Sequence, residues 1–91
     1  MSLGDKYPDL VSFIGAYFAD LDDEEAVKDF LSEESSLQHM RVIDQLNNLL
    51  KESDLPYEEL EHWSLRDLPN GEEARQWLTE ILVMLEAEKG S

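Results

Sequence analysis

Apolar residues recur at spacings of three and four along most of this chain, which is the spacing that gathers side chains on one face of an α-helix. Nowhere do apolar and polar residues alternate over several positions, as they would in a half-buried strand. We therefore expect an all-α fold: a compact bundle of four to five short helices that forms one domain over residues 1–91. The pattern predicts helices over 9–18, 22–31, 35–50, a short segment after Pro56, and 70–85.

Three of these helices begin at residues that cap helix N-termini. Asp22, Ser35 and Asn70 each precede an apolar stripe, and their side-chain oxygens can accept hydrogen bonds from backbone N–H groups of the first turn. Pro8 suits the first turn of the first predicted helix, because the N–H it lacks would be unpaired there.

The stripes also predict the core. The run at 81–85 is apolar all round, so we expect the last helix to be central to the bundle. Gly15, inside the first helix, indicates close approach by another helix. For the helix over 35–50 the predicted inward stripe is Met40, Ile43, Leu46, Leu49 and Leu50.

The positions of four large aromatic residues on these stripes indicate whether each is buried or exposed. Tyr17, Phe18 and Trp77 are predicted core residues, Trp77 because its helix is the most apolar. Trp63 ends a short helix before a polar loop, so it fits either the core or an exposed binding position.

Charge narrows the classes of partner. Among 91 residues, 22 are Asp or Glu and seven are Lys or Arg, which gives a net charge of -15. Such a chain repels phosphate, so nucleic acid and anionic membranes are not expected as direct partners, whereas a basic protein is. The sequence has no apolar stretch of membrane-spanning length, no secretory signal and no cysteine, so we expect a cytoplasmic protein without disulfides.

Motifs for chemistry are weak. Glu59 and His62 have the spacing of a di-iron ligand pair, but one copy cannot build that site. A calcium loop starting at Asp20 would place Glu25 where an EF-hand needs Gly, and Leu31 where it needs Glu. We therefore predict no catalytic residue, no metal and no cofactor, and hence a protein that is not an enzyme.

Acidic residues gather in two regions, which are the candidate contact surface for a basic partner. Aromatic residues beside the second region could anchor an interface. The predicted binding residues are Asp20, Asp22, Asp23, Glu24 and Glu25 in the first region, and Tyr57, Glu58, Glu59, Glu61 and Trp63 in the second.

Four segments follow one another in a recognisable order: Tyr7-Pro-Asp-Leu10, Phe13-Ile-Gly-Ala-Tyr-Phe18, Glu24-Glu-Ala-Val-Lys-Asp-Phe-Leu31 and Arg75-Gln-Trp-Leu78. Their order and spacing resemble the small helical immunity proteins of bacterial contact-dependent growth inhibition systems, over nearly the whole chain. Members of that family often carry Asp-Trp after the Tyr-Phe step, whereas this chain reads Ala19-Asp-Leu-Asp22, which is shorter and lacks the Trp.

The resemblance implies a cytoplasmic immunity protein that binds the toxic C-terminal domain of its cognate effector. The sequence does not determine the oligomeric state, and we favour a monomer in a 1:1 complex. Such toxins are commonly nucleases, whose basic surfaces an acidic protein can cover. Two alternatives stay open on the residues alone: an acidic helical module that regulates a host protein, and a nucleic-acid mimic whose carboxylates stand in for phosphates.

Overall fold

The computed structural model describes residues 3–89, and these form helices without any strand, which confirms the all-α prediction. Within that range no helix is long and apolar enough to cross a membrane. The helices are α1 (Leu3–Lys6), α2 (Pro8–Tyr17), α3 (Asp23–Glu33), α4 (Ser36–Leu50), α5 (Tyr57–Ser64) and α6 (Gly71–Lys89).

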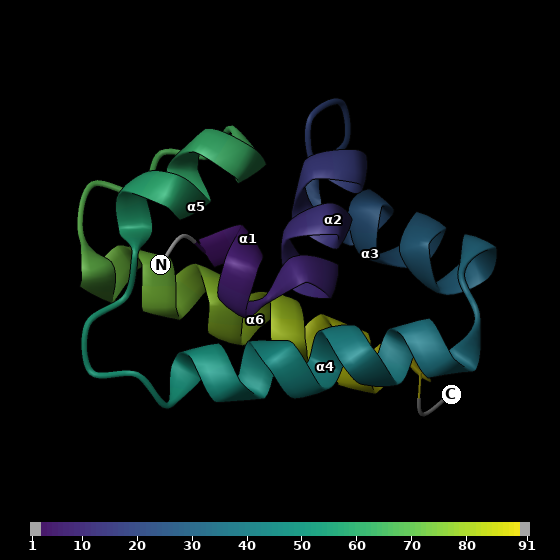
Figure 1. Cartoon of the computed structure of the whole chain (residues 1–91). Helices are drawn as coiled ribbons and strands as arrows, with labels where there is room; N and C mark the ends of the chain where they lie inside the picture. Colours follow the sequence, from purple (N-terminus) through teal and green to yellow (C-terminus); the bar gives the residue numbers. More distant parts are fainter. Residues whose placement is uncertain (1–2, 90–91) are drawn as a thin grey trace.

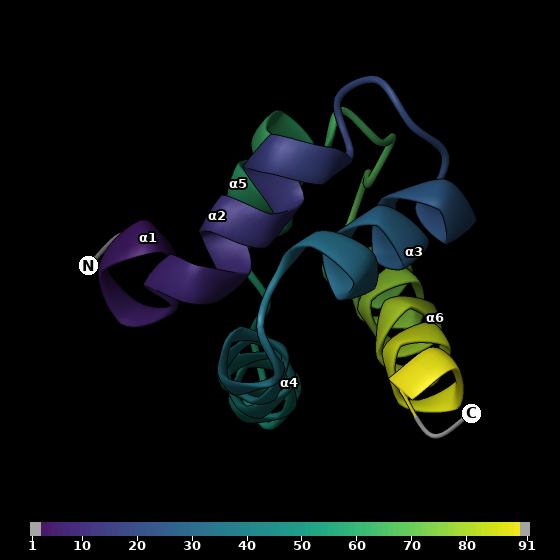
Figure 2. The ribbon, with the colours of Figure 1, turned by 90° about the vertical axis from the view of Figure 1, so that its right-hand side faces the viewer.

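The helices form two layers. The two longest, α4 and α6, pack side by side in one layer, and α2 and α3 lie across them, α2 mainly on α4 and α3 mainly on α6 (Figures 1 and 2). Helix α5 packs against α2 and α6 at one end of the molecule, on the side away from α4 (Figure 1). The bundle therefore leaves the outer face of α5 and the loops on either side of it open to a partner.

Aromatic rings fill the space between the layers. The Phe13 ring lies 4.4 Å from that of Phe30 and 5.1 Å from that of Phe18, measured between centroids. Trp77 of α6 meets Phe18 edge-on at 5.5 Å, and only 7% of its surface is exposed. The predictions of Phe18 and Trp77 as core residues are confirmed, and Tyr17 packs half-buried at the core's edge.

The predicted helix starts are confirmed. Asp22 Oδ1 accepts the Glu25 N–H at 2.9 Å, and Ser35 Oγ accepts the Gln38 N–H at 3.2 Å. In the same way, Asn70 Oδ1 accepts a backbone N–H at the start of α6. These caps connect residues three apart, so the local sequence is sufficient to specify them.

Gly15 does mark the close approach of another helix. A Cβ atom built on Gly15 of α2 would lie 3.2 Å from Cε3 of Trp63 on α5, tighter than an ordinary van der Waals contact. The absent side chain is what allows the indole to lie this close to α2.

The predicted stripe of α4 is confirmed at Leu46 and Leu49, which are buried, and wrong at Met40, which is exposed. Ile43 and Leu50 are half-buried against the core, and Val42 and His39 turn inward although they were not predicted. Apolar residues occupy adjacent faces of this helix, so the period alone does not determine where its buried stripe is centred. The structure takes the rotation that buries Val42 completely and sets His39 against Phe30, with ring centroids 5.2 Å apart.

Two further expectations need correction. Helix α6 is not enclosed on every side, because Val83 is exposed while Ile81 and Leu85 are buried. The short α1 was not predicted, since a single apolar residue, Leu3, gives no period. The Leu3 backbone N–H donates to Glu59 Oε2 at 2.8 Å, a contact between residues far apart in the sequence.

Candidate functional site

The first acidic region is largely occupied by contacts within the fold. Asp22 caps α3, and Glu24 pairs with Lys28 at 3.0 Å across one helical turn. Asp23 accepts the Arg66 Nε–H at 3.0 Å through Oδ1 and the Trp77 Nε1–H at 3.0 Å through Oδ2. The side chains of Asp20 and Glu25 are exposed and make no hydrogen bond or ion pair with the described side chains, so these two carboxylates are the available charges of this region.

Arg66 joins the two acidic regions in space. Its guanidinium donates to the backbone oxygen of Phe18 at 3.0 Å, to that of Leu21 at 2.7 Å and to that of Ser64 at 3.1 Å, in addition to the Asp23 carboxylate. The α2–α3 loop and the segment that follows α5 therefore lie against each other. This places the loop that carries Asp20 beside the C-terminal end of α5.

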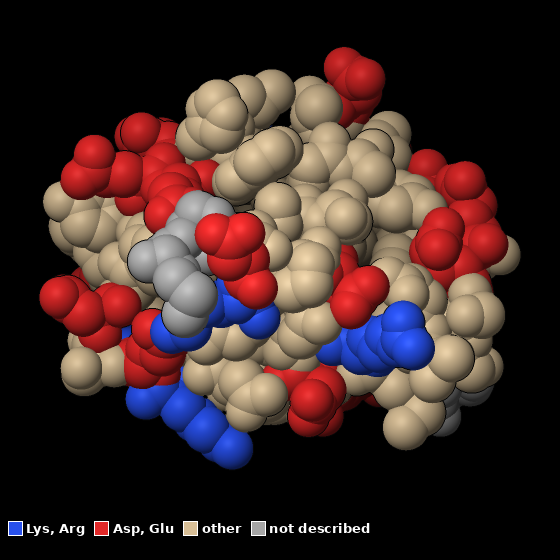
Figure 3. All heavy atoms as spheres, in the orientation of Figure 1, with Lys and Arg blue, Asp and Glu red and all other residues tan. Residues whose placement is uncertain are grey.

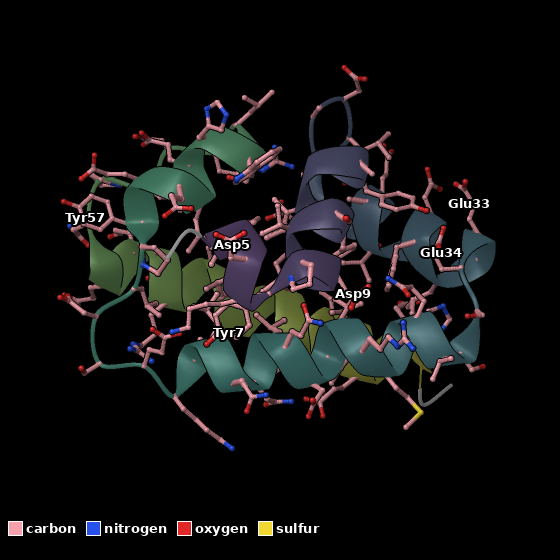
Figure 4. The ribbon with its side chains drawn as sticks, in the orientation of Figure 1. Asp5, Tyr7, Asp9, Glu33, Glu34 and Tyr57 are labelled. Atoms are coloured by element: carbon pink, nitrogen blue, oxygen red, sulfur yellow. The ribbon has the colours of Figure 1, made fainter. Side chains whose placement is uncertain are left out.

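The second acidic region divides between two faces of α5. Glu59 turns toward α1 and accepts the Leu3 N–H, and Tyr57 lies half-buried at the helix start, at the edge of the molecule in Figure 4. Glu58 and Glu61 lie on the outer face. Glu61 Oε2 accepts the Leu68 N–H at 2.9 Å but stays exposed, and Glu58 makes no hydrogen bond or ion pair with the described residues.

A groove of about 540 Å³ follows this outer face. Three of its residues, Glu58, Glu61 and His62, share one side of the helix, and the segment beyond the helix supplies the rest. The lining residues are Glu58, Glu61, His62, Leu65, Arg66 and Asp67. Because the Arg66 guanidinium is turned inward to Asp23 and to carbonyl oxygens, three carboxylates dominate the charge of the groove.

Two exposed apolar side chains lie at the C-terminal end of α5. Trp63 is 41% exposed although its ring lies on Gly15, and Leu65 is 66% exposed. The structure thus decides the question that the sequence left open for Trp63: the indole is supported on one face and accessible on the other.

The face shown in Figure 3 carries red carboxylates in clusters toward both of its ends, with tan surface between them and fewer blue groups. At one end of this view Glu33 and Glu34 close α3, at the end opposite Tyr57 (Figure 4). Glu34 accepts a hydrogen bond from the Tyr17 hydroxyl at 3.1 Å. Acidic surface is therefore widespread. The α5 end differs from the groove on α4, where exposed Leu37 and Met40 lie beside Arg41 and Asp44, because its own groove holds three carboxylates and its one arginine is turned inward.

A second, polar cavity of about 520 Å³ lies between α1, the α4–α5 loop and the start of α5. In it the Tyr7 hydroxyl donates to Glu52 Oε2, and Lys6 Nζ lies 3.1 Å from the same oxygen. The hydrogen bond to Glu52, together with burial and the charge of that carboxylate, raises the pKa of Tyr7 to about 12. The bonds from Tyr7 and Lys6 lower the pKa of Glu52.

This contact predicts a loss of stability in alkali. The Tyr7 pKa is higher in the folded protein than the ordinary 10.0, so its contribution is complete below that value and is lost as pH rises toward about 12. Tyr7→Phe should be less stable at neutral pH but lose less stability over this range. Tyr17, whose pKa burial and Glu34 also raise to about 12, should account for part of what remains. Urea unfolding midpoints measured across this pH range test this, and equal losses in variant and parent would contradict it.

Residues 3–89 contain no group of three or more His, Asp or Glu side chains placed to hold a metal ion. His62 is exposed and stacks edge-on against Trp63 at 5.3 Å, while Glu59 three residues earlier is engaged with Leu3. Glu59 and His62, which have the spacing of a di-iron ligand pair, therefore contact different groups.

Four residues of the groove were absent from the predicted site: His62, Leu65, Arg66 and Asp67. The spacing of Glu58, Glu61 and His62 along one helix face is a signal that the sequence does contain. Asp67 gives no such signal. It lies in the segment after α5, which reaches the groove because Arg66 binds it to the α2–α3 loop.

Comparison of the chain with protein-family models, curated proteins and solved structures finds no significant match.

Proposed function

We propose that this chain is an immunity protein, which binds the toxic domain of a contact-dependent growth inhibition effector and blocks it stoichiometrically. One observation carries the proposal beyond the sequence resemblance: free carboxylates at Asp20 and Glu58 border an end of the molecule where Trp63 and Leu65 are exposed. Exposed Trp anchors surrounded by charge are typical of protein interfaces.

The chemistry of the partner follows from the charge. A nuclease holds its substrate through Lys and Arg that contact phosphates. A protein with a net charge of -15 is attracted to that surface over a distance and, once bound, excludes nucleic acid from it. In this account the immunity protein works in the cytoplasm as a monomer in a 1:1 complex and performs no chemistry.

Co-expression with the toxin domain encoded directly upstream tests the proposal. We expect the two proteins to co-purify and the chain to restore growth of cells that produce the toxin. Failure of both would remove the immunity function and favour a regulatory module for a host protein.

Charge reversal then tests the surface. The double variant Asp20→Lys with Glu58→Lys should associate with the toxin at least about tenfold more slowly at low salt, because the local field at the α5 end reverses. The control, Glu33→Lys with Glu86→Lys, changes the net charge equally at exposed positions outside that end. Equal association rates for the two variants, measured by stopped flow, would place the contact elsewhere.

A further inference from the structure

Leu65 occupies a position that normally belongs to glycine. It follows the last residue of α5 with φ 59° and ψ 26°, and its N–H donates to the Glu61 carbonyl oxygen at 3.0 Å. In this left-handed conformation a Cβ crowds the backbone, so helices usually end there with Gly or Asn. Among the described non-glycine residues no other has a positive φ.

The Leu65 side chain gains nothing evident from the fold in return. It is 66% exposed, so the residue combines an unfavourable backbone conformation with an unburied apolar group. Strain that is held at an exposed position is characteristic of binding sites. The observation points to a contact that forms only with a partner.

Trp63 supplies a second exposed apolar group in the same segment. Its ring packs on α2, where Gly15 makes room for it, and lies 5.3 Å from the His62 ring. A large aromatic side chain that already packs on one face loses less conformational entropy on binding than a fully exposed one, which suits an interface anchor.

The groove beside Leu65 identifies the group it would receive. Glu58, Glu61 and Asp67 line it, and the Arg66 guanidinium is committed to Asp23 and backbone oxygens. A Lys or Arg side chain fits this lining, with its charged end at the carboxylates and its aliphatic stem against Leu65.

We propose that the outer face of α5, from Glu58 to Leu65, is the surface that contacts the toxin. It takes a basic side chain of the toxin into the groove, and Leu65 is the apolar anchor beside it. The inference rests on the proposed function and deepens it, since it chooses the α5 face over the N-terminus of α3, where Asp22 and Asp23 are engaged within the fold.

The test compares two leucines of similar exposure. Leu65→Asn keeps a residue that tolerates the left-handed conformation, and Leu37→Asn changes a leucine that is 60% exposed on α4, the helix on the side away from α5 (Figures 1 and 2). Binding to the purified upstream toxin domain is measured by surface plasmon resonance. We expect the dissociation constant to rise at least about tenfold for Leu65→Asn and less than about twofold for Leu37→Asn.

Thermal melting of the free protein supplies the second readout. Because Asn is better suited than Leu to this backbone conformation, Leu65→Asn should melt no lower than about 2 °C below the parent. A larger drop would mean that Leu65 serves the fold, and would overturn the inference.

The outcomes separate the two proposals. If the parent protein binds the toxin and Leu65→Asn binds it equally well, the anchor assignment is wrong and the immunity function stands. If the parent does not bind the toxin at all, the immunity function fails and the assignment fails with it.

The double variant Glu58→Gln with Glu61→Gln tests the groove separately. It should weaken toxin binding and reduce the dependence of that binding on salt. An unchanged salt dependence would exclude a basic side chain in the groove.

Discussion

Replacement of Trp77 by alanine is expected to lower the free energy of unfolding by about 3–5 kcal/mol. The indole is 7% exposed and meets Phe18 at 5.5 Å, so its removal leaves a cavity between the two layers of helices. The same change removes the Nε1–H that Asp23 accepts at 3.0 Å. A domain this small has about 5–15 kcal/mol of stability in total, so the variant should be partly unfolded under ordinary conditions.

Urea unfolding followed by far-UV circular dichroism measures the effect. Trp63→Ala is the control, because it removes the same side chain from a position that is 41% exposed; we expect it to cost about 1–2 kcal/mol, since only one face of the ring is packed. Trp77→Phe keeps a ring but not the donor, so it should fall between the parent and Trp77→Ala. A cost below about 1 kcal/mol for Trp77→Ala would show that α3 and α6 do not pack as described.

Arg66→Met is the second substitution with a large expected effect, about 3 kcal/mol. One guanidinium serves four acceptors: the Asp23 carboxylate and the carbonyl oxygens of three residues, Phe18, Leu21 and Ser64. Methionine keeps the apolar stem but leaves these oxygens without their donor. Arg66→Lys should recover little of the lost stability. A single ammonium group cannot donate to all four of the acceptors that the planar guanidinium contacts.

Arg41 provides the control for this prediction. It is exposed on α4 and makes no hydrogen bond or ion pair with the described residues, so Arg41→Met should stay within about 0.5 kcal/mol of the parent. Amide hydrogen exchange locates the effect: Arg66→Met should lose protection in the α2–α3 loop and at the end of α5. Similar unfolding energies for Arg66→Met and Arg41→Met would show that the loop is held by other contacts.

The sequence was sufficient where the structure depends on near neighbours. Asp22 and Ser35 were predicted as helix caps because each bonds to an N–H three residues on. It was insufficient for the rotation of α4, where Met40 and Val42 fit the apolar period almost equally well. Only contact with Phe30 and the other helices determines that Val42 and His39 face inward.

The candidate site shows the same division. The sequence identified both acidic regions, but it could not tell a free carboxylate from an engaged one. Asp23 and Asp20 look alike in the chain, yet Arg66 and Trp77, more than 40 residues away, occupy Asp23 alone. The left-handed conformation of Leu65 was equally beyond reach, since nothing in the composition around it requires a positive φ.

Binding of a basic toxin domain at the α5 end can be measured by isothermal titration calorimetry of the purified chain with the upstream toxin domain, at low and at moderate salt. We expect a 1:1 complex with a dissociation constant below about 1 μM at low salt, and weaker binding as salt screens the charges. No detectable binding at low salt, or an affinity that does not depend on salt, would contradict this expectation.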